Sequence, residues 1–171
     1  MIFEYKHLLD PEFHPSSRVW IYQSSRLFTL GEALEIEGIL EDFHTQWKSH
    51  GADVKNQIHL FFGQFIVFMA DESATTVGGC STDSSVRVVK EIEKRFGVNM
   101  FDRQALAFLV NDKIQLLPMS QVPYAVEKGF LSSDTLYFNN LVANKKELEE
   151  KWMVPISKSW LSEKFSLITS S

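Results

Sequence analysis

The chain alternates short, strongly apolar runs with longer stretches in which apolar residues recur every three or four positions. The apolar runs at 18–24, 58–62, 65–70 and 105–110 are rich in β-branched and aromatic residues, which is typical of strands. The periodic stretches at 29–47 and 82–96 predict amphipathic helices. Thr29 and Glu32 form a capping-box pattern that predicts the start of the first helix, and Gly51 is expected to end it.

Residues that favour tight turns separate two pairs of apolar runs. Gly63-Gln64 lies between 58–62 and 65–70, and Asn111-Asp112 lies between 105–110 and 113–117. Each pair is therefore predicted to form a hairpin, and both strands of the first hairpin are expected to be central in a sheet. A strand at 135–138 and a short helix that begins near Asn144 complete the expected elements.

The order strand, helix, strand, strand, helix, strand is that of split βαβ, or ferredoxin-like, folds. We therefore expect an α+β two-layer sandwich of this type, with an added hairpin strand and a C-terminal strand-helix extension. Residues 1–17 are predicted to form an N-terminal arm, because they contain two prolines and show weak periodicity. Residues 18–160 are predicted to form one α+β domain, and residues 161–171 a C-terminal tail. The chain is expected to be irregular from Pro155 onward.

Composition and charge narrow the classes of function. A chain of 171 residues that is 44% hydrophobic can bury the core of one domain. Its formal net charge of −5 argues against a general binder of phosphate backbones, so nucleic acid is not an expected partner. One cysteine cannot form an intramolecular disulfide, and no apolar run approaches the roughly 20 residues that span a bilayer. We therefore expect a cytoplasmic protein without a membrane span.

The densest polar segment runs from Gly78 to Ser85 into the second predicted helix. A glycine turn at a helix N-terminus exposes amide donors and a partial positive charge, which suits a small anionic ligand or a reactive thiolate on Cys80. The alternative is structural: Asp83 or Ser84 caps the helix, and Cys80 is a small buried hydrophobe. Candidate ligand-binding residues are Gly78, Gly79, Cys80, Ser81, Asp83, Ser84 and Ser85, joined by Arg18 and Arg103 if these converge on the turn.

Other catalytic and metal-binding motifs are incomplete in the sequence. The run 65–70 ends in Asp71-Glu72, as a Walker B strand does, but no glycine-rich phosphate loop with its Lys-[Ser/Thr] occurs. No histidines are spaced i, i+4, and there is no Gly-x-Ser-x-Gly elbow, so no metal or cofactor is expected and an enzyme is disfavoured. The first predicted helix carries Glu32, Glu35, Glu37, Glu41 and Asp42, which form either a solvated face or a surface for a basic protein.

Several strings of the sequence are distinctive when they are taken together: RVWIYQS at 18–24, WKSHG at 47–51, GCSTDSSV at 79–86, FDR at 101–103 and FNNLV at 138–142, with Pro155 and Ser159-Trp160. They resemble a family of small uncharacterised proteins from Bacteroidetes, and the resemblance covers residues 18–160. Members of that family are often labelled "ABC transporter ATPase", which implies a nucleotide-related role as a transporter accessory.

Three functional hypotheses follow from the sequence. The first is a non-enzymatic cytoplasmic binding protein, which takes a protein partner or a small anionic ligand at the Gly78 to Ser85 turn. The second is a thiol-dependent enzyme or redox sensor that uses Cys80 as its candidate catalytic residue. The third is the nucleotide-related accessory that the family label suggests. The expected architecture is also compatible with a homodimer through a sheet face or edge.

Overall fold

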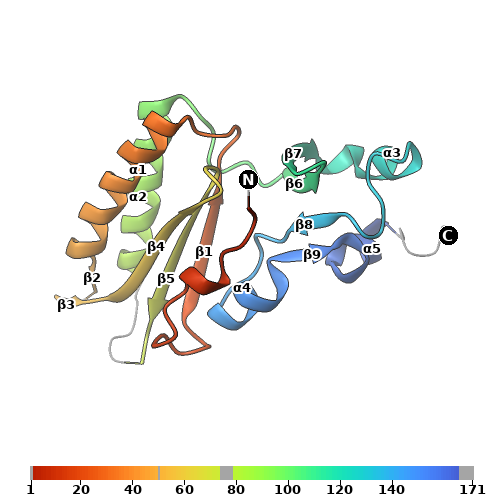
Figure 1. Cartoon of the computed structure of the whole chain (residues 1–171). Coiled ribbons are helices and arrows are strands. Elements are labelled where there is room, and N and C mark those ends of the chain that lie inside the picture. The colour runs from red at the N-terminus through yellow and green to blue at the C-terminus, as the bar shows by residue number, and fades with distance from the viewer. Residues whose placement is uncertain (1, 50, 74–78, 166–171) are drawn as a thin grey trace. The chain divides into compact units, whose positions relative to one another are not determined.

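In the computed structural model the chain is a mixed α+β protein with two main antiparallel sheets, which confirms the predicted α+β class (Figure 1). The structure describes residues 2–49, 51–73 and 79–165, and only the backbone of residues 49 and 79–81. The chain divides into two compact units. The larger comprises Ile2–Phe101 with Leu141–Glu149, and the smaller comprises Asp102–Asn140 with Glu150–Ser171.

The larger unit is built on a three-stranded antiparallel sheet of order β1-β5-β4. Its strands are β1 (Arg18–Gln23), β4 (Lys55–Phe61) and β5 (Phe65–Asp71), and β4 and β5 form the predicted first hairpin. Every residue of β5 is buried, as its unbroken apolar sequence predicts for a central strand. The expectation that β4 is also central is wrong, because β4 is an edge strand and begins with three polar residues.

Helices α1 (Leu30–Gln46) and α2 (Gly79–Phe96) lie together on one face of this sheet (Figure 1). The predicted capping box is confirmed, since the Thr29 hydroxyl accepts from the Glu32 amide and the Glu32 carboxylate accepts from the Thr29 amide. Gly51 does not end α1: the helix ends at Gln46, and Gly51 has a φ of +81° in the turn between β2 (Lys48–Ser49) and β3 (Ala52–Asp53). The core between sheet and helices includes Ile36, Leu40, Ile66, Phe68, Val89 and Ile92.

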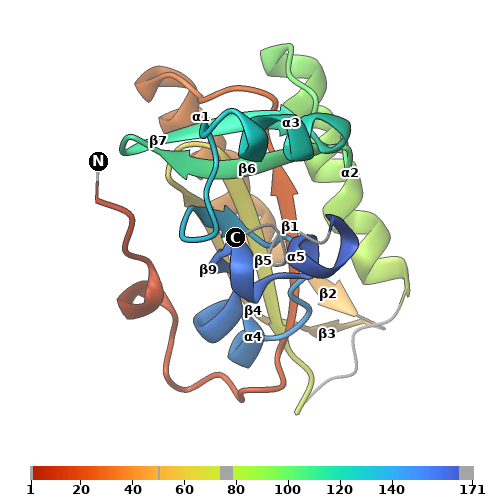
Figure 2. The same ribbon diagram turned by 90° about the vertical axis from the view of Figure 1, so that its right-hand side faces the viewer.

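Residues 2–17 of the predicted N-terminal arm belong to the larger unit and contain the 3-10 helix η1 (Lys6–Leu8) (Figure 2). Tyr5, Leu9 and Phe13 are buried in this segment at a spacing of four residues. The buried Lys145 ammonium donates to the carbonyl oxygens of Asp10 and Phe13, each at 2.9 Å. Burial and these charge-assisted hydrogen bonds fix a segment whose sequence lacks a clear period.

The outer edge of β1 is covered by the segment that leads into α4 (Lys145–Lys151). Arg18 forms an antiparallel bridge with Asn144. The Val19 amide donates to the Ala143 carbonyl at 3.0 Å, and the Lys145 amide donates to the Ser17 carbonyl at 2.8 Å. The β1 edge is therefore closed by backbone pairing, whereas no strand among the described residues pairs with the outer edge of β4.

The smaller unit contains a four-stranded antiparallel sheet of order β7-β6-β8-β9. The predicted second hairpin is confirmed, and Asn111 and Asp112 have φ values of 52° and 59° at its turn. Residues 160–165 lie in the stretch from Pro155 onward that was expected to be irregular, but they form a helix, and Leu161 is fully buried in the core of this unit. The elements are β6 (Ala105–Val110), β7 (Lys113–Pro118), η2 (Met119–Gln121), α3 (Val122–Glu127), β8 (Leu136–Phe138), β9 (Met153–Pro155), η3 (Ile156–Lys158) and α5 (Trp160–Phe165).

The sheet topology differs from the single sandwich that the element order predicted. Strand β6 was expected to continue the split βαβ pattern, but it pairs with β7 and β8 in the separate sheet of the smaller unit. The residues beside β1 come instead from the segment around Asn144. Strand pairing joins residues distant in sequence, so element order alone did not determine which sheet β6 enters.

Candidate functional site

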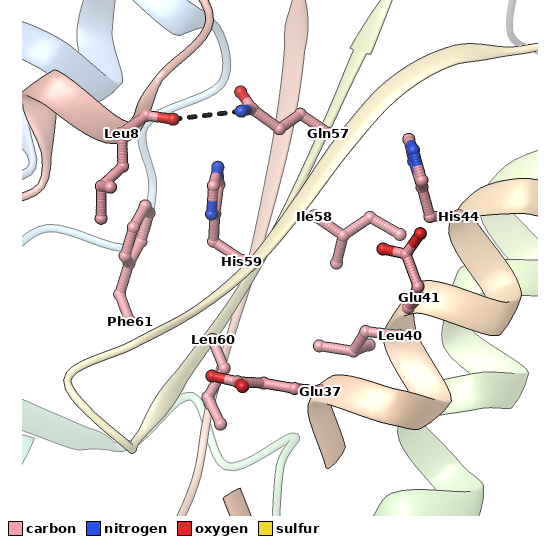
Figure 3. Close-up of a pocket in the computed structure, with 10 residues that line it drawn as sticks. All are labelled: Leu8, Glu37, Leu40, Glu41, His44, Gln57, Ile58, His59, Leu60 and Phe61. Carbon is pink, nitrogen blue, oxygen red and sulfur yellow. Dashed lines mark hydrogen bonds between the residues drawn. The ribbon is translucent and has the colours of Figure 1, made fainter. Parts of the chain in front are cut away.

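A groove of about 380 Å³ runs along the outer edge of β4 in the larger unit (Figure 3). Three segments line it: the N-terminal segment, α1 and β4 itself. Leu8 comes from the first, and Glu37, Leu40, Glu41 and His44 come from the second. The five consecutive residues Gln57, Ile58, His59, Leu60 and Phe61 come from β4.

The β4 residues place the groove at the edge of the sheet. Successive side chains of a strand point to opposite faces, so Ile58 and Leu60 lie on one face and His59 and Phe61 on the other. Figure 3 shows Ile58 toward α1, and His59 and Phe61 toward Leu8. Side chains from both faces can line one groove only where it passes around the strand's open edge. The groove therefore follows the side of β4 that carries backbone donors and acceptors outside the ladder with β5.

Four residues of α1, Glu37, Leu40, Glu41 and His44, form the wall of this groove on the helical side. Three of them belong to a stripe that continues toward the start of the helix at spacings of four, three, four and three, about a third of a turn from the buried Ile36. Leu30 and Leu34 in the stripe are large apolar residues that are 77% and 61% exposed. The other flank of α1 faces α2, since Glu35 there pairs with Arg95 at 3.0 Å. The stripe consists of Leu30, Leu34, Glu37, Glu41 and His44.

The two carboxylates of the groove make the wall negatively charged. Glu37 and Glu41 are exposed, and no ion pair holds either of them within the described part of the chain. By contrast, Glu32 on the same helix is paired bidentately with Arg26 at 2.8 Å, which lowers the pKa of Glu32 to about 2. No described cation therefore competes with a ligand for the two groove acids.

His44 fixes the end of α1 to the start of β4. Its Nδ1 lies 2.7 Å from Oδ1 of Asn56, and the Asn56 amide group donates to the carbonyls of His44 and Val54 at 3.2 and 2.9 Å. Because the Asn56 amide nitrogen is used in this way, its oxygen faces the ring, and His44 Nδ1 carries the proton. These hydrogen bonds hold α1 against the start of β4 at this end of the groove.

His59 is a packed part of the opposite wall. Its ring stacks on that of Phe61, with centroids 4.7 Å apart and planes 15° from parallel. Nε2 of His59 is buried and has no hydrogen-bond partner among the described residues. Burial lowers the pKa of His59, because an imidazolium there would lose its hydration without gaining a partner. His59 therefore contributes a neutral, flat ring surface.

The structure changes the picture of the glycine turn predicted from sequence. Gly78 lies outside the described residues, and α2 already begins at Gly79, so residues 80–85 form the first turns of the helix rather than a loop before it. Ser85 is buried, and its hydroxyl donates to the Thr82 carbonyl at 2.6 Å. Asp83 is exposed and Ser84 is half-buried. The side chains of Cys80 and Ser81 lie outside what is described, so a reactive thiol at Cys80 stays a prediction.

The two candidate arginines are engaged elsewhere or belong to another unit. Arg18 pairs with Glu72 at 3.3 Å, and its guanidinium lies 4.7 Å from the centre of the Trp20 ring. Arg103 is an exposed residue of the smaller unit, whereas α2 belongs to the larger one. The neighbouring Asp102 accepts from the Gln104 amide at 2.9 Å, which is a local loop contact.

Neither a metal site nor a membrane helix is found in the parts of the chain that the structure describes. No three His, Cys, Asp or Glu side chains there are grouped so that they could hold a metal ion. No helix there has the length and apolar character needed to cross a membrane. The groove along β4 is thus the feature of the larger unit that combines concave shape, apolar surface and unpaired charge.

Part of this groove could be predicted from the sequence. The acidic surface of the first helix is predicted, whereas the exposure of Leu30 and Leu34 on the same stripe as Glu37 and Glu41 is evident only in the structure. Polar residues at the start of β4 were a further sign of an edge strand. No family model, curated protein or solved structure matches the chain. Its function is therefore inferred from the groove itself.

Proposed function

We propose that this chain is a non-enzymatic binding protein that takes an extended segment of a partner protein as an additional strand on β4. The observation that carries the proposal is a groove lined from both faces of an edge strand, because such a groove has the shape of the strand that would occupy it. Strand addition uses main-chain hydrogen bonds for affinity and side-chain contacts with the flanking walls for specificity.

The walls of the groove supply those side-chain contacts. On the helical side an added strand would meet Glu37, Leu40, Glu41 and His44 of α1. On the other side it would meet Leu8, His59 and Phe61. Leu8 is 47% exposed, so a bound segment would bury apolar surface on this side as well. Each new main-chain hydrogen bond adds about 1 kcal/mol net, and several in a row give a specific but reversible complex.

The chemistry of the lining favours binding over catalysis. General acid-base chemistry needs a proton-transfer group within hydrogen-bond reach of a reacting atom. In the groove, His44 is held by Asn56, and the inner nitrogen of His59 is enclosed by protein. The remaining polar side chains are Gln57, whose amide group is bonded to the backbone of Leu8 and Asp10, and two solvated carboxylates, whose role in this setting is electrostatic attraction.

We also propose that the larger unit is a variant of the ferredoxin-like arrangement. Its element order β1, α1, β4, β5, α2 and its sheet order β1-β5-β4 support this description. The segment around Asn144 takes the place beside β1 that a fourth strand would occupy in that fold. In such a sheet the outer edge of β4 is left open, as the proposed binding mode requires.

Peptide selection followed by N-methylation tests the proposed function. A library of short random peptides is selected against the full chain, and each selected peptide is resynthesised with N-methyl groups on alternate residues in either of the two registers. Strand addition predicts that one register abolishes binding and the other is tolerated, because only alternate amides point toward β4. Amide NMR signals of β4 should shift on binding. Equal tolerance of both registers, or shifts confined to other elements, would contradict the proposal.

A further inference from the structure

We infer that the bound segment carries an apolar residue followed by two basic residues at alternate positions, in the order apolar-x-basic-x-basic, and that it runs antiparallel to β4. This inference rests on the proposed function, since it names the class of partner segment that the same groove would take. It is drawn from the direction of α1, from the spacing of side chains along its outer stripe and from their charge.

The direction of α1 relative to β4 is fixed at both ends of the groove. Phe28, just before α1, donates its amide to the carbonyl of Gly63, just after β4, at 2.8 Å. His44, near the end of α1, contacts Asn56, near the start of β4. The helix and the strand therefore run in opposite directions. Antiparallel pairing is the commoner and slightly more stable mode, so a segment added to β4 in that mode runs parallel to α1.

The spacing along α1 matches the repeat of an extended strand. Glu37 and Glu41 are four residues apart, which is about 6 Å along a helix axis at 1.5 Å per residue. Alternate residues of a strand, which share a face, are separated by about 6.8 Å. Two basic residues at positions i and i+2 of the bound segment would thus each face one glutamate. Leu30 and Leu34 are centred about 7 Å before Glu37, one further alternate position toward the N-terminus.

The charge of the groove selects this occupant over a second copy of the chain. Edge-to-edge pairing of two β4 strands about a two-fold axis would place both α1 helices on the same side of the joined sheet. Glu37 and Glu41 of one copy would then face the same acids of the other, and like charges in this position oppose association. A segment with two cations removes the repulsion and replaces it with attraction. The partner is therefore a basic extended segment of another protein.

A peptide panel tests the inferred pattern by isothermal titration with the full chain. The first peptide has Leu, Lys and Lys at alternate positions in that order, with Thr between them. The second has the same residues in reverse order, and the third replaces both lysines with glutamate. We expect the first peptide to bind at least about tenfold more tightly than the third, from two ion pairs gained against two repulsions, and several-fold more tightly than the second.

A charge swap in the protein provides the decisive arm of the test. The double variant Glu37→Lys/Glu41→Lys is expected to reverse the preference, so that it binds the glutamate peptide more tightly than the lysine peptide. Glu91→Lys, an exposed site on α2, is the matched control and should leave the preference unchanged within about twofold. Circular dichroism and thermal melting of each variant establish that it folds. A folded double variant with unaltered preference would overturn the inference.

The remaining outcomes distinguish a failure of the inferred sequence pattern from a failure of the proposed strand addition. If library peptides bind along β4 in one N-methylation register but all panel peptides bind equally, the charge pattern is wrong and strand addition stands. If tight binders of the reversed order emerge, the direction is wrong. If no peptide binds along β4, both proposals fail together. A concentration-dependent dimer in sedimentation equilibrium that is strengthened by Glu37→Gln/Glu41→Gln and blocks peptide binding would show that a second copy is the occupant.

Discussion

The two edges of the three-stranded sheet are treated in opposite ways. At the β1 edge, the segment around Asn144 supplies backbone hydrogen bonds at 3.0 and 2.8 Å, and it is anchored in turn by the buried Lys145. At the β4 edge, no strand pairs within the described residues, and a groove follows the strand instead. In the same sheet, a chain segment therefore pairs with the β1 edge, while the β4 edge stays open.

This difference bears on function because an open edge is a hazard. Unpaired strands invite association with other chains, and natural proteins commonly cover them, shorten them or place charges beside them. The β4 edge is seven residues long, no described strand pairs with its outer side, and the acidic side chains of α1 flank it. The negative charges of α1 oppose pairing with a second copy of the chain, but they attract a basic segment. The β1 edge is closed by backbone pairing with the segment around Asn144, so under the proposed function the β1 edge contributes to stability and the β4 edge to binding.

The largest expected effect is that of breaking the closed edge at Lys145. Lys145→Met keeps most of the aliphatic stem but leaves the carbonyls of Asp10 and Phe13 without their donor in a buried setting. We expect the free energy of unfolding to fall by about 2–3 kcal/mol. Losing a hydrogen bond to a charged group, or leaving a buried acceptor without a donor, costs a free energy of this order. Urea denaturation measures the change. Hydrogen exchange of the Val19 amide, which is bonded to Ala143, should also accelerate.

Lys146→Met serves as the matched control for the closed edge. Lys146 is exposed and adjacent, so its replacement should change the free energy of unfolding by less than about 0.5 kcal/mol. Equal destabilisation by the two substitutions would show that Lys145 acts only through helix α4 and does not hold the N-terminal segment.

The next largest effect is expected at Asp71, which forms an ion pair with Lys55, the first residue of β4. Burial opposes ionisation of its carboxyl group, but hydrogen bonds from the Ser73 and His14 amides and from Lys55 outweigh it and hold the pKa of Asp71 at about 2. A depressed pKa stabilises the folded state above the ordinary value of 3.8, and this stability is lost as pH falls toward 2.

Asp71→Asn should therefore lower the free energy of unfolding by about 1–2 kcal/mol at neutral pH and by much less near pH 2. Urea denaturation at both pH values measures the difference. Exchange of β4 amides should rise more than that of the Val19 amide, because Lys55 begins β4. A deficit that is the same at both pH values would mean that shape rather than charge is responsible.

Local features of the fold could be predicted from the sequence because local interactions determine them. The first helix start follows from Thr29 and Glu32, and the second hairpin turn from Asn111-Asp112, since each is set by residues within a few positions. The central strand β5 follows from an unbroken apolar run. These elements, and the α+β class they imply, needed no knowledge of distant contacts.

The edges and the groove could not be predicted in this way. Which segment closes β1 depends on contacts across more than a hundred residues of chain, as between Val19 and Ala143. The Asn144 region reads locally as a helix start, which it also is, so its second role beside β1 has no local signal. The groove arises where α1, β4 and Leu8 meet, and only the acidic half of its stripe stood out in the sequence.

The smallest effect, and the one that most sharpens the contrast between the edges, is expected from His59→Phe. Burial lowers the pKa of His59, so an unfolded chain binds more protons than the folded one as pH falls below the ordinary value of 6.5. The wild-type protein therefore loses stability in that range, and His59→Phe should flatten the loss while changing stability at neutral pH by less than about 1 kcal/mol. Thermal melting from pH 7.5 to pH 5 measures this, with the exposed His7→Phe as control. Because a phenyl ring preserves the flat surface stacked on Phe61, affinity for the lysine peptide should stay within twofold. A large loss of affinity would mean that the imidazole makes a polar contact with the bound segment that a phenyl ring cannot replace.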